Sequence, residues 1–105
     1  MGRLEKLKVE GKFKLGQLVM TRGVNDRVAE SEEFAVFVWQ SLKRHANGDW
    51  GKIGKEDRQE NEFSLNKHLR LFSAYIYEER GRTFEIYIIT EADRSATTIL
   101  FPEEY

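Results

Sequence analysis

The stretch LRLFSAYIYEERGRTFEIYIITE, residues 69–91, decides the fold of this chain of 105 residues. Apolar and aromatic side chains fill its two halves, Leu69–Glu78 and Thr83–Glu91, and polar residues separate them. This pattern is typical of two strands joined by a tight turn. A two-residue turn at Arg80-Gly81 fixes the register of the hairpin. On one face, the register pairs Leu71 with Thr90, Ser73 with Ile88, Tyr75 with Ile86 and Tyr77 with Phe84.

The two faces of this hairpin differ in composition. The face just described is mostly apolar, and we expect it to pack against a helix. The opposite face is mixed, with Arg70 opposite Glu91, Phe72 opposite Ile89, Ala74 opposite Tyr87 and Ile76 opposite Glu85.

The rest of the chain supplies further strands and the helix. A last strand is expected at Ala96–Phe101, where Pro102 ends it, and a short one at Gly16–Thr21. Val24–Glu30 is expected to form one helical turn. Ser31 is a good N-cap for a helix over Glu32–Ala46, and a shorter helix is expected at Lys55–Leu65. The sequence therefore predicts an α+β fold, in which an antiparallel sheet of three to four strands packs against one long helix, with a second short helix.

Length and composition limit the classes of function. We expect a charged N-terminal arm at residues 1–15 and a single domain at residues 16–105. The 17 basic and 18 acidic residues give a net charge of -1, which argues against a dedicated nucleic-acid binder. The absence of cysteine excludes disulfides, thiolate zinc sites and cysteine nucleophiles. No apolar run is long enough for a membrane span, and we expect a cytoplasmic protein.

Polar residues gather in two places that could carry chemistry. His45 precedes several acids and could act as a general base near neutral pH. The alternative is that His45 complements the end of its helix and Asp49 caps the next turn. The loop after residue 90 is also polar, and Arg94 could brace it or stabilise a phosphate. The facing pair Arg70 and Glu91 is either a cross-strand ion pair or part of a site. No nucleophile elbow, phosphate loop, metal motif or glycine-rich dinucleotide turn is present, so we expect no cofactor and no metal.

Several strings resemble one small bacterial family, labelled "plasmid-related protein" and in some cases type I restriction subunit. They are TRGVND at residues 21–26, RH at residues 44–45, GDWG at residues 48–51, ED at residues 56–57 with Asn61, LFSAY at residues 71–75 and the C-terminal string IITEADRSATTILFPEEY at residues 88–105. The resemblance covers roughly residues 16–105. It implies a prokaryotic setting and an association with plasmids or other mobile elements, and it brings no established activity. The positions that it emphasises are His45, Asp49, Trp50, Asp57, Asn61, Arg70, Ser73, Tyr75, Glu91, Asp93, Arg94, Thr97 and Thr98.

Three functions follow from these observations. The first is a protein-interaction or regulatory module that binds an unknown protein partner, with a homodimer through the apolar Phe34–Leu42 helix as one assembly. The second is a small hydrolase or nuclease, whose candidate catalytic residues are His45, Asp57, Arg70, Glu91 and Arg94. The third is a non-catalytic nucleic-acid binder with a basic patch and Trp50 as a stacking platform. The candidate binding residues are Asp49, Trp50, Asn61, Tyr75, Asp93 and Ser95.

Overall fold

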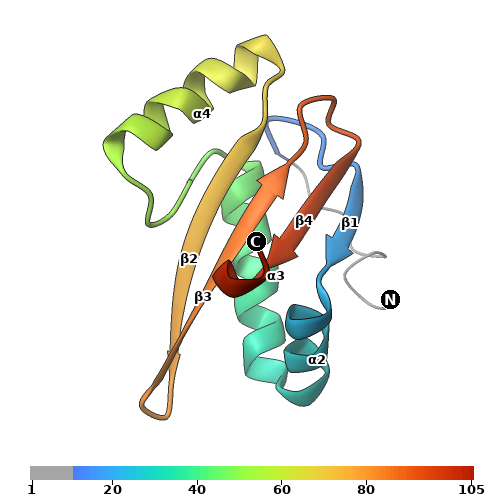
Figure 1. Cartoon of the computed structure of the whole chain (residues 1–105), viewed down its shortest axis with the longest axis vertical. Coiled ribbons are helices and arrows are strands. Elements are labelled where there is room, and N and C mark those ends of the chain that lie inside the picture. Colours follow the sequence, from blue (N-terminus) through green and yellow to red (C-terminus); the bar gives the residue numbers. More distant parts are fainter. Residues whose placement is uncertain (1–10) are drawn as a thin grey trace.

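A four-stranded sheet forms the centre of the protein (Figure 1). The computed structural model describes residues 11–105, so most of the expected N-terminal arm lies outside the described residues. The strands are β1 (Gln17–Met20), β2 (Leu71–Glu79), β3 (Arg82–Thr90) and β4 (Ala96–Leu100), in the order β1-β4-β3-β2. Strands β2, β3 and β4 form the expected antiparallel meander.

The α+β class is confirmed, but two details of the prediction are wrong. The sheet is mixed, because β1 runs parallel to β4. Parallel neighbours need a long crossover connection, and here the helices and the β2–β3 hairpin together supply it. The described chain also holds three α-helices rather than one long and one short one. They are α2 (Arg22–Glu30), α3 (Glu32–Ala46) and α4 (Lys55–Lys67), and a short 3-10 helix, η1 (Pro102–Glu104), follows the last strand.

Helix α2 is longer than the single turn that the sequence suggested, because a distant carboxylate caps it. The Glu104 side chain accepts hydrogen bonds from the Gly23 N–H at 2.8 Å and from the Thr21 hydroxyl at 2.5 Å. Partial burial works to raise the pKa of Glu104, but the hydrogen bonds from Thr21, Phe101 and Gly23 outweigh it and lower this pKa. A negative charge at a helix N-terminus stabilises the helix. This cap comes from residues about 80 positions away, so local sequence rules miss it.

Helix α3 begins and ends where the sequence places it. The Ser31 hydroxyl accepts a hydrogen bond from the Phe34 N–H at 3.1 Å, which is the expected N-cap. Phe34, Val38 and Leu42 are fully buried in the core between α3 and the sheet. The apolar stripe that motivated the homodimer prediction is thus used within the subunit, and Val36, 52% exposed, is the large apolar side chain that α3 leaves to solvent.

The β2–β3 hairpin has the predicted register at every pair from Leu71–Thr90 to Tyr77–Phe84. Its turn residues Arg80 and Gly81 have φ angles of 50° and 78°. Positive φ at both central residues is the mark of a type I′ turn, whose twist matches that of the flanking strands. Gly81 adopts this conformation freely, whereas Arg80 pays a steric cost for it.

Replacing Arg80 with Asn should therefore stabilise the protein. Asn tolerates the left-handed region better than Arg, and Asn-Gly is the preferred type I′ pair. We expect the free energy of unfolding to rise by about 0.5 kcal/mol in urea denaturation. A matched Arg82→Asn change in the first position of β3 should give no gain. An equal gain from both variants would contradict the assignment of the cost to the turn.

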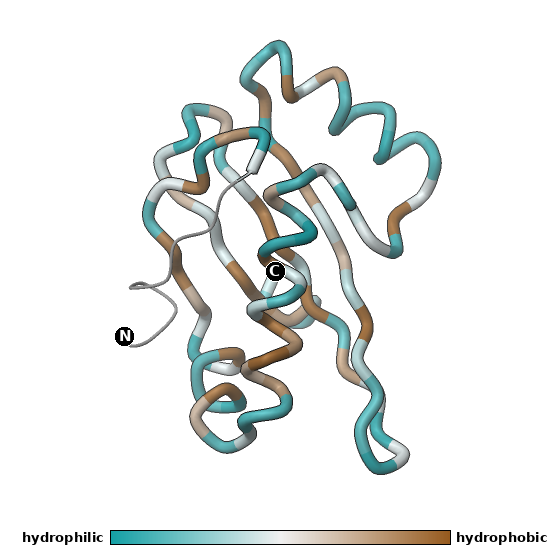
Figure 2. The backbone as a smooth tube through the Cα atoms, turned by 180° about the vertical axis from the view of Figure 1, so that it is seen from behind, coloured by the Kyte–Doolittle hydropathy of each residue, from teal (hydrophilic) through white to brown (hydrophobic). Residues whose placement is uncertain are grey.

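The two faces of the sheet are covered unequally. Helices α2 and α3 lie on one face, as the view from behind shows (Figure 2). Of residues 11–105, only η1 and the C-terminal residue lie across the other face, while α4 lies beside β2 (Figure 1). Within residues 11–105, no helix is both long and apolar enough to cross a bilayer.

Candidate functional site

His45 lies in the core, between α3 and the sheet, and is fully buried. Its Nδ1 is 2.6 Å from the Ser73 hydroxyl and its Nε2 is 2.9 Å from the Thr90 hydroxyl. Thr90 in turn contacts the Thr97 hydroxyl at 2.7 Å, and Thr97 donates to the Leu15 carbonyl at 2.7 Å.

The direction of this chain of hydrogen bonds fixes the tautomer of His45. The Leu15 carbonyl can only accept, so the Thr97 hydroxyl donates its proton to that carbonyl. The Thr97 oxygen must then accept a hydrogen bond from the Thr90 hydroxyl. The Thr90 oxygen is then the acceptor for the Nε2–H of His45, and Ser73 donates to Nδ1. Burial, with the charge of Arg94 as a smaller cause, lowers the pKa of His45 to about 3. His45 is thus a neutral, enclosed side chain with both ring nitrogens occupied, which does not favour the general-base role.

The loop after α3 is tied to the end of that helix and to β2. Asp49 accepts two hydrogen bonds from Arg44, at 2.7 and 3.1 Å, and this contact holds the pKa of Asp49 below its usual range. Tyr75 donates its hydroxyl proton to the Asp49 carbonyl at 2.6 Å. Trp50 is 2% exposed and donates its indole N–H to Glu62 at 2.9 Å. A ring enclosed in this way cannot serve as a stacking platform for bases.

Asn61 caps the outer edge of β2. Its side-chain amide donates to the Phe72 carbonyl at 2.7 Å, and its side-chain carbonyl accepts from the Phe72 N–H at 3.1 Å. One residue pair further along, Ala74 bonds in the same way to the backbone of Trp50 and Lys52. A buried side chain on α4 therefore replaces the next strand at the start of β2.

Replacing Asn61 with Ala should leave both polar groups of Phe72 without these partners. We expect a loss of about 1–2 kcal/mol in unfolding free energy. Amide hydrogen exchange at Phe72 should also become faster. The matched control is Asn66→Ala, an exposed residue of the same helix, for which we expect a change below about 0.5 kcal/mol. Equal losses from both variants would mean that α4 is merely sensitive to alanine at these positions.

Arg94 binds carbonyl groups rather than a carboxylate. One terminal nitrogen donates to the carbonyls of Leu69, Glu91 and Ala92 at 2.6, 3.0 and 3.3 Å, and the other to Ser64 at 3.0 Å. These carbonyls belong to the end of α4, the α4–β2 connection and the β3–β4 loop. Arg94 therefore has a bracing role, which the sequence offered as one of its two uses.

The remaining residues of the β3–β4 loop hold their own turn. The Asp93 carboxylate accepts from the Ser95 N–H at 3.0 Å. Hydrogen bonds from the Ser95 side chain and backbone lower the pKa of Asp93. Both candidate binding residues in this loop are exposed, yet their polar groups are directed at each other.

Three predicted residues do meet, in a hollow of about 440 Å³ between α4 and β2. Asp57, Asn61 and Arg70 line it, and Phe72 lies among them. The Arg70 guanidinium is 4.0 Å from the carboxylate of Glu91, so the cross-strand pair exists but is long and exposed. His45 and the guanidinium of Arg94 are engaged elsewhere. The sequence analysis named five candidate catalytic and six candidate binding residues. Of these eleven, three line a common hollow.

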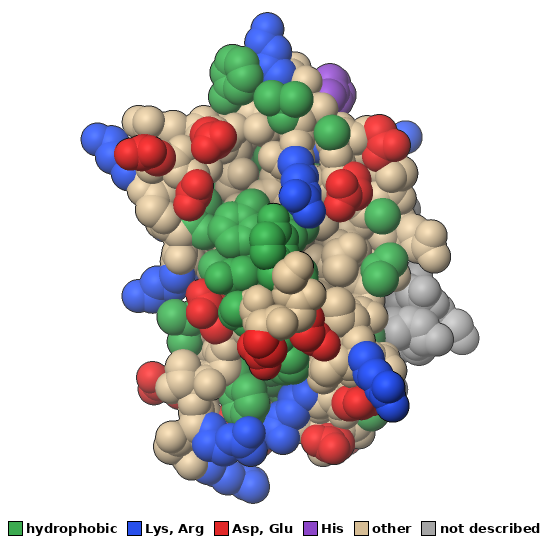
Figure 3. All heavy atoms as spheres, in the orientation of Figure 1, with side chains coloured by type: hydrophobic (Ala, Val, Ile, Leu, Met, Phe, Trp, Pro, Cys, Tyr) green, Lys and Arg blue, Asp and Glu red, His purple; other side chains and the backbone are tan. Residues whose placement is uncertain are grey.

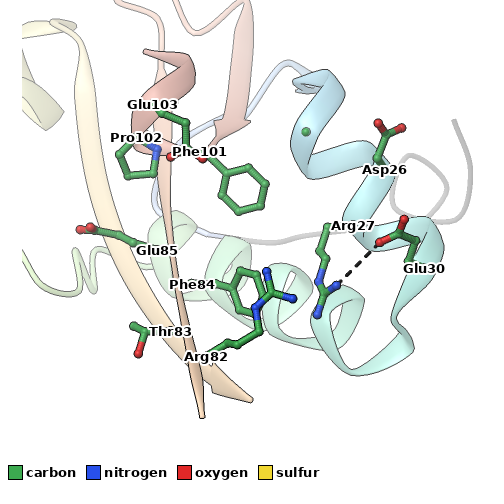
Figure 4. A pocket seen from close by; sticks show the side chains of 11 residues that line it. Asp26, Arg27, Glu30, Arg82, Thr83, Phe84, Glu85, Phe101, Pro102 and Glu103 are labelled. Atoms are coloured by element: carbon green, nitrogen blue, oxygen red, sulfur yellow. Dashed lines mark ion pairs between the residues drawn. The ribbon is translucent and has the colours of Figure 1, made fainter. Parts of the chain in front are cut away.

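A second hollow, of about 770 Å³, lies between α2 and the far end of the β2–β3 hairpin (Figure 4). The guanidinium groups of Arg27 and Arg82 lie 4.6 and 4.9 Å from the Phe84 ring centre. Arg27 also lies 3.7 Å from both Glu30 and Glu79. Four acids share the lining with the two arginines, namely Asp26, Glu30, Glu85 and Glu103, so its charge does not select for an anion.

The open face of the sheet is the feature that sequence reasoning missed. Phe72 and Tyr87 pack edge to face with ring centres 4.9 Å apart, and Tyr105 approaches Tyr87 at 6.2 Å. Ile76 is 44% exposed beside them. Figure 3 shows the resulting apolar patch in the middle of this face. The sequence correctly assigned the opposite face of the hairpin to a helix, where Tyr75, Ile86 and Ile88 pack with α3, but it did not predict that this mixed face would stay open and carry an apolar patch.

Within residues 11–105, no three His, Asp or Glu side chains are grouped so as to hold a metal ion. No family model, curated protein or solved structure matches the chain.

Proposed function

We propose that this protein is a small cytoplasmic protein-interaction module that acts in a plasmid or other mobile-element context. The observation that carries the proposal is the open face of the sheet, which presents an apolar patch between α4 and η1 (Figure 3). The centre of the patch is formed by Phe72, Ile76 and Tyr87. Contiguous apolar surface of this kind, surrounded by polar side chains, marks protein-binding surfaces. The mobile-element context is supported by the resemblance of residues 16–105 to plasmid-related proteins.

The hydrolase alternative receives less support from the geometry. His45 is enclosed by hydroxyl partners, and Arg94 is occupied by backbone carbonyls. Asp57 and Arg70 do share a hollow, but no described histidine lines it to serve as a base. The observed contacts give most of the emphasised residues a part in holding the fold together.

The nucleic-acid alternative is weakened by what surrounds the basic residues. Arg44 is paired with Asp49, and Arg27 lies between two carboxylates. Acidic side chains also border the open face (Figure 3). A polyanion would meet these carboxylates before it reached the aromatic rings.

A photo-crosslinking amino acid placed at Tyr87 tests the proposal in cells that encode the protein. We expect a discrete protein adduct from this position, and loss of the adduct when Ile76 is also changed to Ser. The matched control places the same crosslinker at Val36, which is exposed on α3 behind the sheet. Equal adducts from both positions, or none from Tyr87, would contradict the proposal.

A further inference from the structure

We infer that the open face binds a basic amphipathic helix of a partner protein, with one lysine or arginine of that helix in the hollow beside α4. This inference rests on the proposed function and adds the kind of partner.

Around Phe72 and Tyr87 the face presents side chains over paired backbone, which selects a helix over an extended peptide. Strands β3 and β4 are internal, each paired on both sides, so their N–H and C=O groups are committed within the sheet. An extended peptide lying on Phe72 and Tyr87 would leave its own backbone groups unpaired against apolar surface. A helix satisfies those groups internally and can place an apolar stripe on the patch.

The surroundings of the patch select a basic partner. Asp57 and Glu60 on α4 line the hollow with Phe72, Glu85 on β3 pairs with Ile76, and Glu103 on η1 lines a hollow with Glu85. Figure 3 shows acidic side chains on several sides of the apolar area. The nearby cations are Arg70, whose guanidinium is 4.0 Å from Glu91, and the Arg27 and Arg82 side chains, which share a hollow with Glu85 and Glu103. The excess of acids favours lysine and arginine flanking the apolar stripe of the partner.

The hollow beside α4 has the composition of a site for one basic side chain. Asp57 and Glu60 are three residues apart on α4, which places them on neighbouring turns of one side, and both line the hollow. Leu69 and Phe72 form apolar lining for the methylene stem of a lysine or arginine. Arg70 also lines the hollow, so the two carboxylates there exceed the single positive charge.

The test uses a fluorescent peptide of leucine and lysine, about 15 residues long so that it forms a helix on binding. We expect saturable binding by anisotropy, with amide NMR shifts confined to the patch and the hollow. The Asp57→Asn/Glu60→Gln variant should weaken binding about three- to tenfold, and Tyr87→Ser about tenfold. A leucine–glutamate peptide with the same pattern should not bind.

Two controls make the outcomes decisive. The Glu32→Gln/Glu33→Gln variant removes two acids from the exposed start of α3, behind the sheet, and should change affinity less than twofold. A proline-interrupted lysine–leucine peptide, which cannot form a helix, should bind at least tenfold more weakly than the helical one. Equal effects from both acid-removal variants, shifts spread over the whole surface, or equal binding of the interrupted peptide would overturn the inference. If crosslinking from Tyr87 succeeds while these peptide results fail, only the partner class is wrong; failure of both removes the proposed function as well.

Discussion

Lowering the pH from 7 to 5 should destabilise the protein by about 2 kcal/mol through His45 alone. The pKa of His45 is about 3 in the folded protein, because burial disfavours the imidazolium and Arg94 repels it. In the unfolded chain its pKa returns to about 6.5. Between about pH 6.5 and pH 3, the unfolded state therefore binds a proton at His45 that the folded state does not bind. Stability is fully present above pH 6.5 and falls as the pH drops from 6.5 towards 3.

The hydrogen-bond chain explains why His45 resists the proton. A protonated ring would need an acceptor at Nδ1, where the Ser73 hydroxyl now donates. Ser73 can reverse its hydroxyl, but the enclosed charge would still lack a carboxylate partner among the described residues. Desolvation of an uncompensated charge is the larger cost.

Urea unfolding at pH 7 and pH 5 measures this effect in the wild type and in His45→Gln. The variant should be less stable at pH 7, because it loses part of the network, but its stability should change about 2 kcal/mol less between the two pH values. The matched control is His68→Asn. His68 is exposed at the end of α4, and its backbone has the left-handed conformation that Asn also tolerates. The attribution to His45 fails if wild type and His45→Gln lose the same amount.

Replacing Arg94 with Lys should reduce the unfolding free energy by about 3 kcal/mol. Lysine keeps the positive charge but carries all its N–H donors on one nitrogen. The planar guanidinium of Arg94 instead reaches carbonyls on three separate segments. Without this fork, the carbonyls of Ser64 and Leu69 lose their link to the β3–β4 loop. We expect α4 to open locally first, since it contacts the sheet mainly through β2.

Amide hydrogen exchange distinguishes this local opening from a uniform loss of stability. In Arg94→Lys, the amides of α4 should exchange faster than those of α3 by a larger factor than in the wild type. Arg70→Lys is the control, because its ion pair with Glu91 is exposed and should contribute little. Uniform acceleration across all helices would contradict the bracing role. A neutral variant, Arg94→Met, should also raise the pKa of His45, since one of its two depressing causes is removed.

The parts of the fold that local rules describe were predictable. The β2–β3 register followed from the position of Arg80-Gly81, and the start of α3 from the Ser31 cap. The parallel pairing of β1 with β4 and the capping of α2 by Glu104 depend on contacts between distant parts of the chain. No local pattern records such contacts.

The sequence singled out polar residues without revealing their roles, and only three of the eleven candidates, Asp57, Asn61 and Arg70, line a common hollow. The polar residues emphasised by the resemblance do occupy structured positions. However, His45, Asn61 and Arg94 form their hydrogen bonds with other groups of the protein itself. A sequence cannot distinguish a polar side chain that faces a ligand from one that faces a backbone carbonyl. The face of the hairpin that packs against α3 was predicted from its apolar composition, but whether another element covers the mixed face depends on where the rest of the chain lies, which no local pattern records.

Asn61 and the Trp50–Lys52 segment occupy backbone groups at the outer edge of β2 that another strand could otherwise pair with. The strand LFSAYIY, residues 71–77, is uncharged, rich in β-forming residues and free of proline, which is the composition of amyloid-forming segments. An edge strand of this kind templates intermolecular sheets when its backbone is free. Proteolytic loss of α4, or unfolding of that helix alone, would free the backbone groups of Phe72 at this edge, and we expect the protein then to aggregate more readily.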